Sequence, residues 1–158
     1  MHPGAAQASR RWPVDRWAEV VRGLRARGAQ IVLSGGPDER ERALAVARRA
    51  GLAESAVLAG RTRPLELAAL VARARLLVSV DTGVAHLATA YGTPSVVLFG
   101  PTDPALWGPP ADRPQHRVLW AGRTGDNFSG RVDPGLLALW PQHVVDAAGE
   151  LLGASPVR

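Results

Sequence analysis

The chain has 158 residues, 46% of them hydrophobic, which is enough for one domain with a sizeable core and excludes wholesale disorder. It has no cysteine, no apolar run near the roughly 18 residues of a membrane-spanning helix and no signal-peptide core, so we expect no disulfides and a cytoplasmic location. Its net charge of +5 rests on scattered arginines with only 5% aromatic residues, which disfavours a nucleic-acid groove.

Helix and strand patterns alternate from one end of the chain to the other. In the first helix, Trp17, Val20, Val21 and Leu24 have helical spacing, and Gly28 provides a stop. The predicted helices span 14–28, 38–51, 63–74, 82–92 and 141–153. The predicted strands span 30–36, 56–60, 75–81, 94–100 and 116–122. This order predicts an α/β fold: one Rossmann-like domain over 1–158, with a doubly wound, mostly parallel sheet.

Two connections and the N-terminus depart from this regular pattern. Residues 100–114 form a loop rich in proline and glycine, and 121–135 is the longest stretch without a predicted element, read either as a lid or as a surface loop. The opening residues 1–5, MHPGA, resemble the loop that follows a strand. A doubly wound sheet normally begins with a strand. We therefore expect the first strand to be missing and the chain to be a piece of something longer.

The strongest functional motif joins a predicted strand to a predicted helix at Asp81, Thr82, Gly83 and His86. The free N–H groups of a helix N-terminus bind phosphate, and a glycine allows the ligand to approach the backbone. Thr82 offers a hydroxyl donor, and His86 lies one turn further along the same face. Asp81 is expected to orient His86 or to cap the helix. The alternative is an ordinary capped helix with a half-buried histidine.

Three further loops supply weaker candidates. Thr102, in FGPTDP, offers a hydroxyl near the same edge of the sheet, although a capped Pro/Gly turn explains the motif equally well. Asp38 and Glu39, in SGGPDE, are placed to bind ribose or to complement their own helix dipole. Arg10 and Arg11 precede the first helix, where an arginine can bind phosphate or simply lie exposed. Trp12 and Trp17 are predicted to be core residues.

Several catalytic classes lack their motifs. There is no G-x-G-x-x-G or Walker-type loop, no nucleophile elbow and no D-x-D pair. The four histidines lack metal-ligand spacing, and Asp126 and Asp133 are too loosely placed to predict a catalytic pair. No metal site and no cofactor are expected.

The segment 78–109, VSVDTGVAHLATAYGTPSVVLFGPTDPALWGP, resembles the signature of the family 9 glycosyltransferases, of which the lipopolysaccharide heptosyltransferases are the best-known members. The stretches HPGA, RRWP, RWAEV and IVLSGGPDE match the same family in the same order. The match runs from residue 2 to about residue 110, and the tail beyond 117 fits loosely. The resemblance implies a place in lipopolysaccharide biosynthesis and a GT-B architecture, with a nucleotide sugar between two Rossmann-like domains. By the same resemblance, this chain would correspond to the C-terminal, donor-binding domain.

The resemblance also implies a role for each candidate residue. The turn Asp81–Gly83 and His86 would hold the donor diphosphate, which in the best-known members belongs to ADP-heptose. Arg10 or Arg11 would assist where the family commonly has lysine. Asp38 or Glu39 would bind ribose. Thr102 would line the site.

The given sequence does not contain the family's N-terminal acceptor domain. The carboxylate that is expected to act as general base belongs to that domain, so it is not found here either. The resemblance therefore implies the donor domain of an inverting, metal-independent glycosyltransferase, which on its own would transfer sugar poorly or not at all. The intact enzyme would act on a glycan or lipid-linked acceptor, with peripheral membrane association compatible with that acceptor. The main alternative is a binding module for nucleotides or nucleotide sugars without catalysis. A sugar-nucleotide epimerase would need additional carboxylates that are not found, and nucleic-acid binding ranks last.

Overall fold

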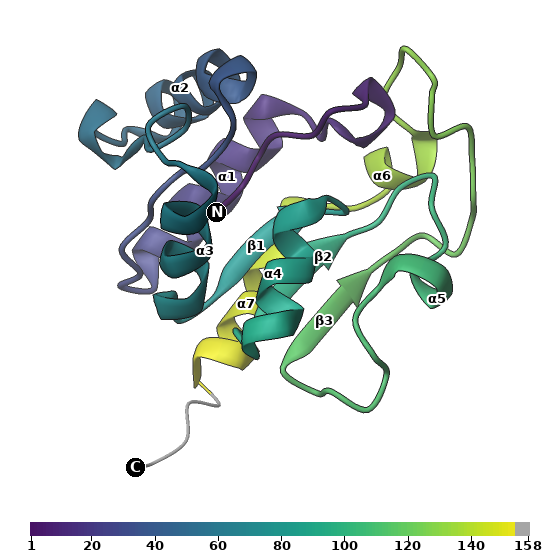
Figure 1. Cartoon of the computed structure of the whole chain (residues 1–158). Coiled ribbons are helices and arrows are strands. Elements are labelled where there is room, and N and C mark those ends of the chain that lie inside the picture. The colour runs from purple at the N-terminus through teal and green to yellow at the C-terminus, as the bar shows by residue number, and fades with distance from the viewer. Residues whose placement is uncertain (154–158) are drawn as a thin grey trace.

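A parallel sheet lies between two layers of helices in the computed structural model, which describes residues 1–153 (Figure 1). Strands β1 (Leu77–Val80), β2 (Ser95–Leu98) and β3 (His116–Leu119) are hydrogen-bonded in the order β1-β2-β3, all parallel. The residues of β1 and β2 are buried throughout, as expected for parallel strands covered on both faces. The predicted α/β fold with a mostly parallel sheet is confirmed.

Single pairs of residues extend this sheet beyond β1. His2 pairs in parallel with Ser79, and Leu33 pairs in parallel with Val57. Met1 joins these two pairings, because its carbonyl accepts a hydrogen bond of 2.9 Å from the N–H of Ser34. Numbered along the chain, the extended segments then follow the order 3-2-1-4-5-6, which is that of doubly wound nucleotide-binding sheets.

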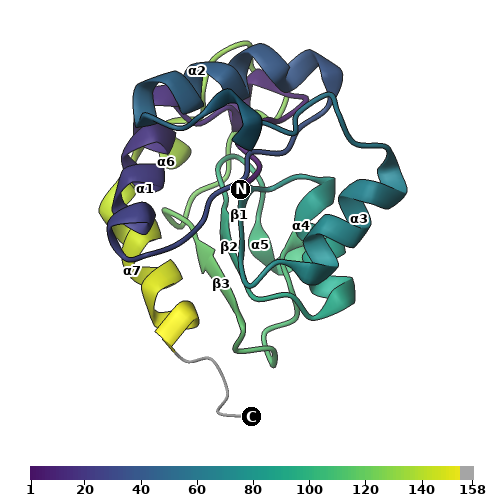
Figure 2. The same cartoon turned by 90° about the vertical axis from the view of Figure 1, so that its left-hand side faces the viewer.

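The helices cover both faces of the sheet. Helices α3 and α4 pack together on one face, while α1 and α7 pack together on the other, with α2 against α1 (Figure 2). The longer helices are α1 (Val14–Ala26), α2 (Arg40–Ala50), α3 (Pro64–Arg73), α4 (Gly83–Tyr91) and α7 (Pro141–Gly153). The short ones are α5 (Pro104–Trp107) and α6 (Pro134–Leu137), with single 3-10 turns at Ala8–Arg10, Pro37–Glu39 and Glu54–Ala56. In residues 1–153 no helix is long and apolar enough to cross a membrane.

The helix ends and the core follow from the residues that the sequence places there. Helix α3 begins with proline at its first position, and α2 and α4 end at Gly51 and Gly92, whose φ values of 66° and 68° favour glycine. Trp12 and Trp17 are fully buried and meet edge to face with ring centroids 5.2 Å apart. Both tryptophans are core residues, as predicted.

Several predicted elements are shorter than expected or absent. The segments 30–36 and 56–60 were predicted as strands, but each contributes only one bridge residue, Leu33 and Val57. The loop 100–114 contains the short helix α5. Asp103 caps its N-terminus, because the Asp103 carboxylate accepts a hydrogen bond from the N–H of Ala105. The long loop 121–135 carries no helix until Pro134. Because no full strand lies between 30–36 and β1, the predicted strand 30–36 has no continuous partner on that side.

Candidate functional site

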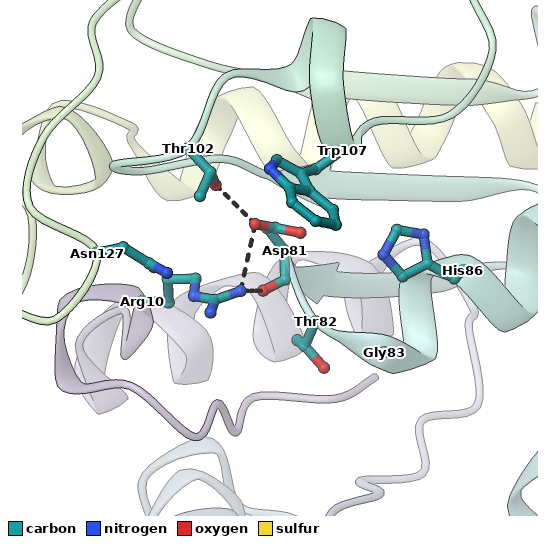
Figure 3. A pocket seen from close by; sticks show the side chains of 8 residues that line it. All are labelled: Arg10, Asp81, Thr82, Gly83, His86, Thr102, Trp107 and Asn127. Atoms are coloured by element: carbon teal, nitrogen blue, oxygen red, sulfur yellow. Dashed lines mark hydrogen bonds and ion pairs between the residues drawn. The ribbon is translucent and has the colours of Figure 1, made fainter.

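A pocket of about 280 Å³ opens where β1 gives way to α4 (Figure 3). It lies at the carboxyl edge of the sheet, where α/β folds bind their ligands. The pocket brings together residues from five separate stretches of the chain. It is lined by Arg10, Asp81, Thr82, Gly83, His86, Thr102, Trp107 and Asn127. Six of the nine residues predicted from the sequence are therefore among its walls.

The open N-terminus of α4 forms one wall. Thr82 is its N-cap residue with extended backbone, and no side chain makes a capping hydrogen bond to the first turn. The first N–H groups of a helix have no partner within the helix and carry partial positive charge. Gly83 is exposed, and a Cβ built on it would meet no atom within 4 Å. An anionic ligand can therefore approach this backbone closely.

Asp81 is buried and holds two other pocket residues in place. Its Oδ2 accepts a hydrogen bond of 2.6 Å from the Thr102 hydroxyl and lies 3.3 Å from Arg10 Nη1. The same Nη1 donates to the Asp81 carbonyl at 2.9 Å. The carboxylate thus interacts with Arg10 and Thr102, and the expectation that Asp81 orients His86 or caps α4 is wrong. Because Arg10 offsets its charge, Asp81 does not leave the pocket negative.

Arg10 and His86 are the cationic or potentially cationic groups of the pocket. The Nε of Arg10 is buried and has no hydrogen-bond partner among residues 1–153, so it keeps a donor to offer. His86 lies one turn into α4 and is exposed. The alternative of an ordinary capped helix predicted a half-buried histidine here, which the structure does not show. Together with the helix N-terminus, these groups make a site suited to phosphate oxygens.

Arg11, Asp38 and Glu39 lie outside the residues that line this pocket. Arg11 donates to the carbonyls of Ala5 and Ala6 and so fixes the N-terminal loop. Asp38 is exposed in the turn before α2. Both acids nevertheless follow the Leu33 segment at the same edge of the sheet as Asp81. Their predicted contact with ribose stays a prediction.

Glu39 has partners within its own loop. Its Oε2 accepts the N–H of Gly36 at 2.7 Å and lies 3.4 Å from Nε2 of His2. The hydrogen bond with His2 is the main cause that lowers the pKa of Glu39, with a further contribution from Gly36. This carboxylate is therefore held ionised next to the first residues of the chain, where it can still accept hydrogen bonds.

Trp107 and Asn127 line the pocket but were not predicted as site residues. Trp107 ends the short helix α5 and is 56% exposed, as an aromatic surface beside the pocket. Asn127 belongs to the long loop 121–135, and its carbonyl accepts a hydrogen bond from the buried Ser9 hydroxyl. Trp107 could have been predicted from the sequence, because it is an aromatic residue in the loop that follows β2 at the edge of the sheet where ligands bind. Asn127 offers no comparable local signal.

Two carboxylates near the pocket, Asp126 and Asp133, are engaged in local hydrogen bonds. Asp133 is buried and caps α6 by accepting the N–H groups of Gly135 and Leu136. Asp126 accepts the N–H of Phe128 within the same loop. No group of three or more histidine, aspartate or glutamate side chains within residues 1–153 could hold a metal ion.

The sequence and the fold are both similar to those of known proteins. The profile of glycosyltransferase family 9 (heptosyltransferase) matches residues 1–128. Lipopolysaccharide heptosyltransferase 3 of Escherichia coli K12 is 38% identical over 111 residues, which are 69% of this chain and 32% of that protein. Lipopolysaccharide heptosyltransferase 2 of Salmonella typhimurium is 31% identical over 163 residues, which cover 98% of this chain and 47% of that protein.

Two solved structures share the fold over nearly the whole chain. The E. coli ADP-heptose lipopolysaccharide heptosyltransferase II superposes with a TM-score of 0.80 and 28% identity, covering 96% of this chain and 45% of that one. The E. coli heptosyltransferase WaaC with ADP gives a TM-score of 0.72 and 27% identity, covering 94% and 42%. The chain therefore spans less than half the length of these relatives.

Proposed function

Because the chain belongs to glycosyltransferase family 9, we propose that it is the half of a glycosyltransferase that binds the nucleotide-sugar donor. The observation that carries this proposal is the uncapped N-terminus of α4, which opens into a pocket with Arg10, His86 and Thr102. This arrangement suits a diphosphate. The heptosyltransferases similar to this chain, one of them solved with ADP, favour ADP-heptose as the donor.

The proposed chemistry is stabilisation of the leaving group. When the bond between the sugar and the diphosphate breaks, negative charge grows on the diphosphate oxygens. The N–H groups at the start of α4 and the guanidinium of Arg10 are fixed in advance to receive that charge, and the Thr82 hydroxyl and His86 lie beside them. These donors act without a metal ion. Asp38 or Glu39 would receive the ribose hydroxyls further along the same sheet edge.

The acceptor hydroxyl must lose its proton during transfer, which requires a base within hydrogen-bond reach. Asp81 is the only carboxylate that lines the pocket of the described chain, and it is already bound to Arg10 and Thr102. We therefore assign the base, and the contacts to a glycan or lipid-linked acceptor, to a second domain. With that domain the reaction is inverting transfer. Without it the chain binds nucleotide sugar and does not transfer, which is the second candidate function.

Thermal stability with ADP, UDP, GDP and CDP tests the proposal directly. A nucleotide at about 100 times its Kd adds about 2.7 kcal/mol to the unfolding free energy, a rise of several degrees in Tm for a domain of this size. We expect ADP to give the largest rise and a His86→Ala chain to lose most of it. A cooperative transition that no nucleotide shifts would contradict the proposal. Incubation with ADP-heptose and a glycan acceptor then separates transfer from binding alone.

Gly83→Ala isolates the approach to the helix N-terminus. The new methyl group would enter open space, and Gly83 has no left-handed backbone, so Tm without ligand is expected to change little. In the pocket, the same methyl group would hold a phosphate away from the first N–H groups of α4. We expect about a tenfold loss of ADP affinity, the cost of about one charge-assisted hydrogen bond.

Gly130→Ala is the matched control, because a Cβ there also meets nothing within 4 Å and Gly130 does not line the pocket. Isothermal titration of both variants with ADP measures the difference. Equal affinity in Gly83→Ala and Gly130→Ala would place the diphosphate elsewhere.

A further inference from the structure

The nucleotide pocket extends from the start of α4 toward one side of the sheet. Among its lining residues, Thr102 and Trp107 follow β2, and Asn127 follows β3. The loop 34–39 contributes no lining residue, and it follows the Leu33 segment, which lies on the other side of β1 in the sheet. The pocket therefore offers space beside the diphosphate on the side away from the loop 34–39.

The order of groups in a nucleotide sugar indicates what fills this space. The molecule is linear, with base, ribose, diphosphate and sugar in sequence. If the diphosphate lies at the start of α4 and the ribose lies near Asp38 or Glu39, the sugar points to the β2 side. The pocket volume of about 280 Å³ is below the roughly 300 to 1,000 Å³ that encloses a drug-sized ligand. It therefore fits only part of the donor, and that part is the diphosphate with its sugar.

Trp107 is held in a fixed position at this side of the pocket. Its N–H donates to the Asp103 carbonyl at 3.3 Å, and the N–H of Gly108 donates to the Pro104 carbonyl at 2.7 Å. A Cβ on Gly108 would lie 2.5 Å from that Pro104 oxygen, so the tight exit from α5 requires glycine. The indole is thus presented by a closed, capped turn.

The faces of the Trp107 ring are free. Among residues 1–153, no aromatic ring or cationic group is stacked on it. Trp140 is exposed to a similar extent, but the Arg16 guanidinium lies 5.0 Å from the centre of its ring. A free aromatic face binds a flat apolar surface. The C–H face of a pyranose ring is such a surface, whereas a diphosphate is not.

Asn127 supplies a polar group for the same ligand. Its Oδ1 is buried and has no hydrogen-bond partner in the described part of the chain, which is unfavourable for a buried acceptor. Figure 3 shows Asn127 on the far side of Asp81 from Trp107, with both side chains at the pocket. A sugar hydroxyl can donate to Oδ1 when the amide turns toward the ligand. An apolar ring and an unpaired amide together suit a carbohydrate.

We propose that Trp107 is the platform for the transferred sugar, a pyranose whose C–H face packs on the indole while Asn127 accepts a hydrogen bond from one of its hydroxyls. The inference deepens the proposed function and rests on it. It makes Trp107 a specificity-determining residue, because the indole contacts the sugar of the donor and not its nucleotide.

Calorimetric titration with ADP and with ADP-heptose separates the sugar contact from the nucleotide contacts. A Trp107→Ala chain is expected to bind ADP-heptose about tenfold more weakly than the parent and to bind ADP with nearly unchanged affinity, because only ADP-heptose covers the indole. Trp107→Phe keeps an aromatic face and should recover most of the loss. Because the Trp107 side chain is largely exposed, neither substitution should change Tm by more than a small amount.

Phe128→Ala is the matched control, since Phe128 is 77% exposed and does not line the pocket. It should leave both affinities unchanged. Equal weakening of ADP and ADP-heptose by Trp107→Ala would assign the indole to the nucleotide and overturn the proposal, as would no weakening of either. A parent chain that binds ADP but not ADP-heptose would overturn the sugar platform alone. A parent chain that binds neither would overturn the proposed function as well.

Acrylamide quenching reports on the indole directly. Subtracting the fluorescence of the Trp107→Phe chain from that of the parent isolates Trp107 from the other tryptophans. Saturating ADP-heptose should protect Trp107 from acrylamide, and saturating ADP should not. Equal protection by ADP would overturn the sugar contact.

Asn127→Ala tests the polar contact separately. This chain should bind ADP-heptose about fivefold more weakly, the cost of about one hydrogen bond, and should bind ADP as the parent does. Unchanged affinity for ADP-heptose would overturn the role of Asn127.

Discussion

An Arg10→Ala chain is expected to lose about 3 kcal/mol of unfolding free energy and at least 90% of its affinity for ADP. Asp81 is 4% exposed, and Arg10 provides its charge partner as well as a hydrogen bond to its carbonyl. Removing one member of a largely buried pair leaves the other charge desolvated and unpaired, which costs about 3 to 5 kcal/mol. The lower figure applies because the Arg10 side chain is 22% exposed. The freed carboxylate would also repel a phosphate.

The double variant Arg10→Ala/Asp81→Asn separates these two effects. Asparagine removes the unpaired charge and retains an oxygen for the Thr102 hydroxyl, so most of the lost stability should return. Affinity for ADP should stay low, because the guanidinium is still absent. Urea denaturation and calorimetric titration measure the two quantities on the same samples. If the double variant binds ADP as well as the parent, Arg10 serves only to neutralise Asp81 and does not contact the ligand.

The part of the site that could be predicted from the sequence lies on one continuous stretch of chain. Asp81 to His86 join a buried strand to a helix, so their placement at the ligand edge follows from local pattern alone. The fold class follows in the same way from the alternation of strands and helices. What local pattern could not supply was the partner of Asp81, because Arg10 is 71 residues away in sequence.

Long-range contacts explain the other differences. Asn127 reaches the pocket because its carbonyl binds Ser9, 118 residues away, within a loop that has no helix or strand of its own. Arg11 was an equal candidate with Arg10, but the carbonyls of Ala5 and Ala6 hold its side chain. Neighbouring arginines in a loop cannot be distinguished by spacing. Their roles depend on which one faces the end of β1.

The position of residues 1 and 2 has a physical consequence that the sequence did not reveal. Residues 1–5 were expected to form a loop, yet Met1 and His2 are held between two strand segments. The sheet therefore keeps its order with only two residues in the central position. The amino group of Met1 is thereby drawn into the protein, and burial lowers its pKa from the ordinary 8.0 to about 5.

Stability should consequently rise with pH between about 5 and 8 in a polypeptide that begins at Met1. Above pH 8 the amine is neutral in the folded and the unfolded chain, and its burial carries no charge penalty. Between pH 8 and 5 the unfolded chain binds a proton that the folded chain does not, so the unfolding free energy falls as the pH falls. Below pH 5 both states are protonated and the dependence on this group ends. A pKa lowered from 8.0 to about 5 corresponds to a total change of about 4 kcal/mol.

N-terminal acetylation gives the matched control, because it removes the charge and keeps an N–H that can donate to the Val32 carbonyl. Glu39 and His116 also have lowered pKa values, but they are the same in both chains and cancel in the difference. Urea denaturation of both chains at pH 5 and pH 8 should show the acetylated chain to be more stable at pH 5, by up to about 4 kcal/mol, and the two chains to be similar at pH 8. Parallel pH profiles would mean that the Met1 amino group stays solvated in the folded chain and that its burial does not lower its pKa.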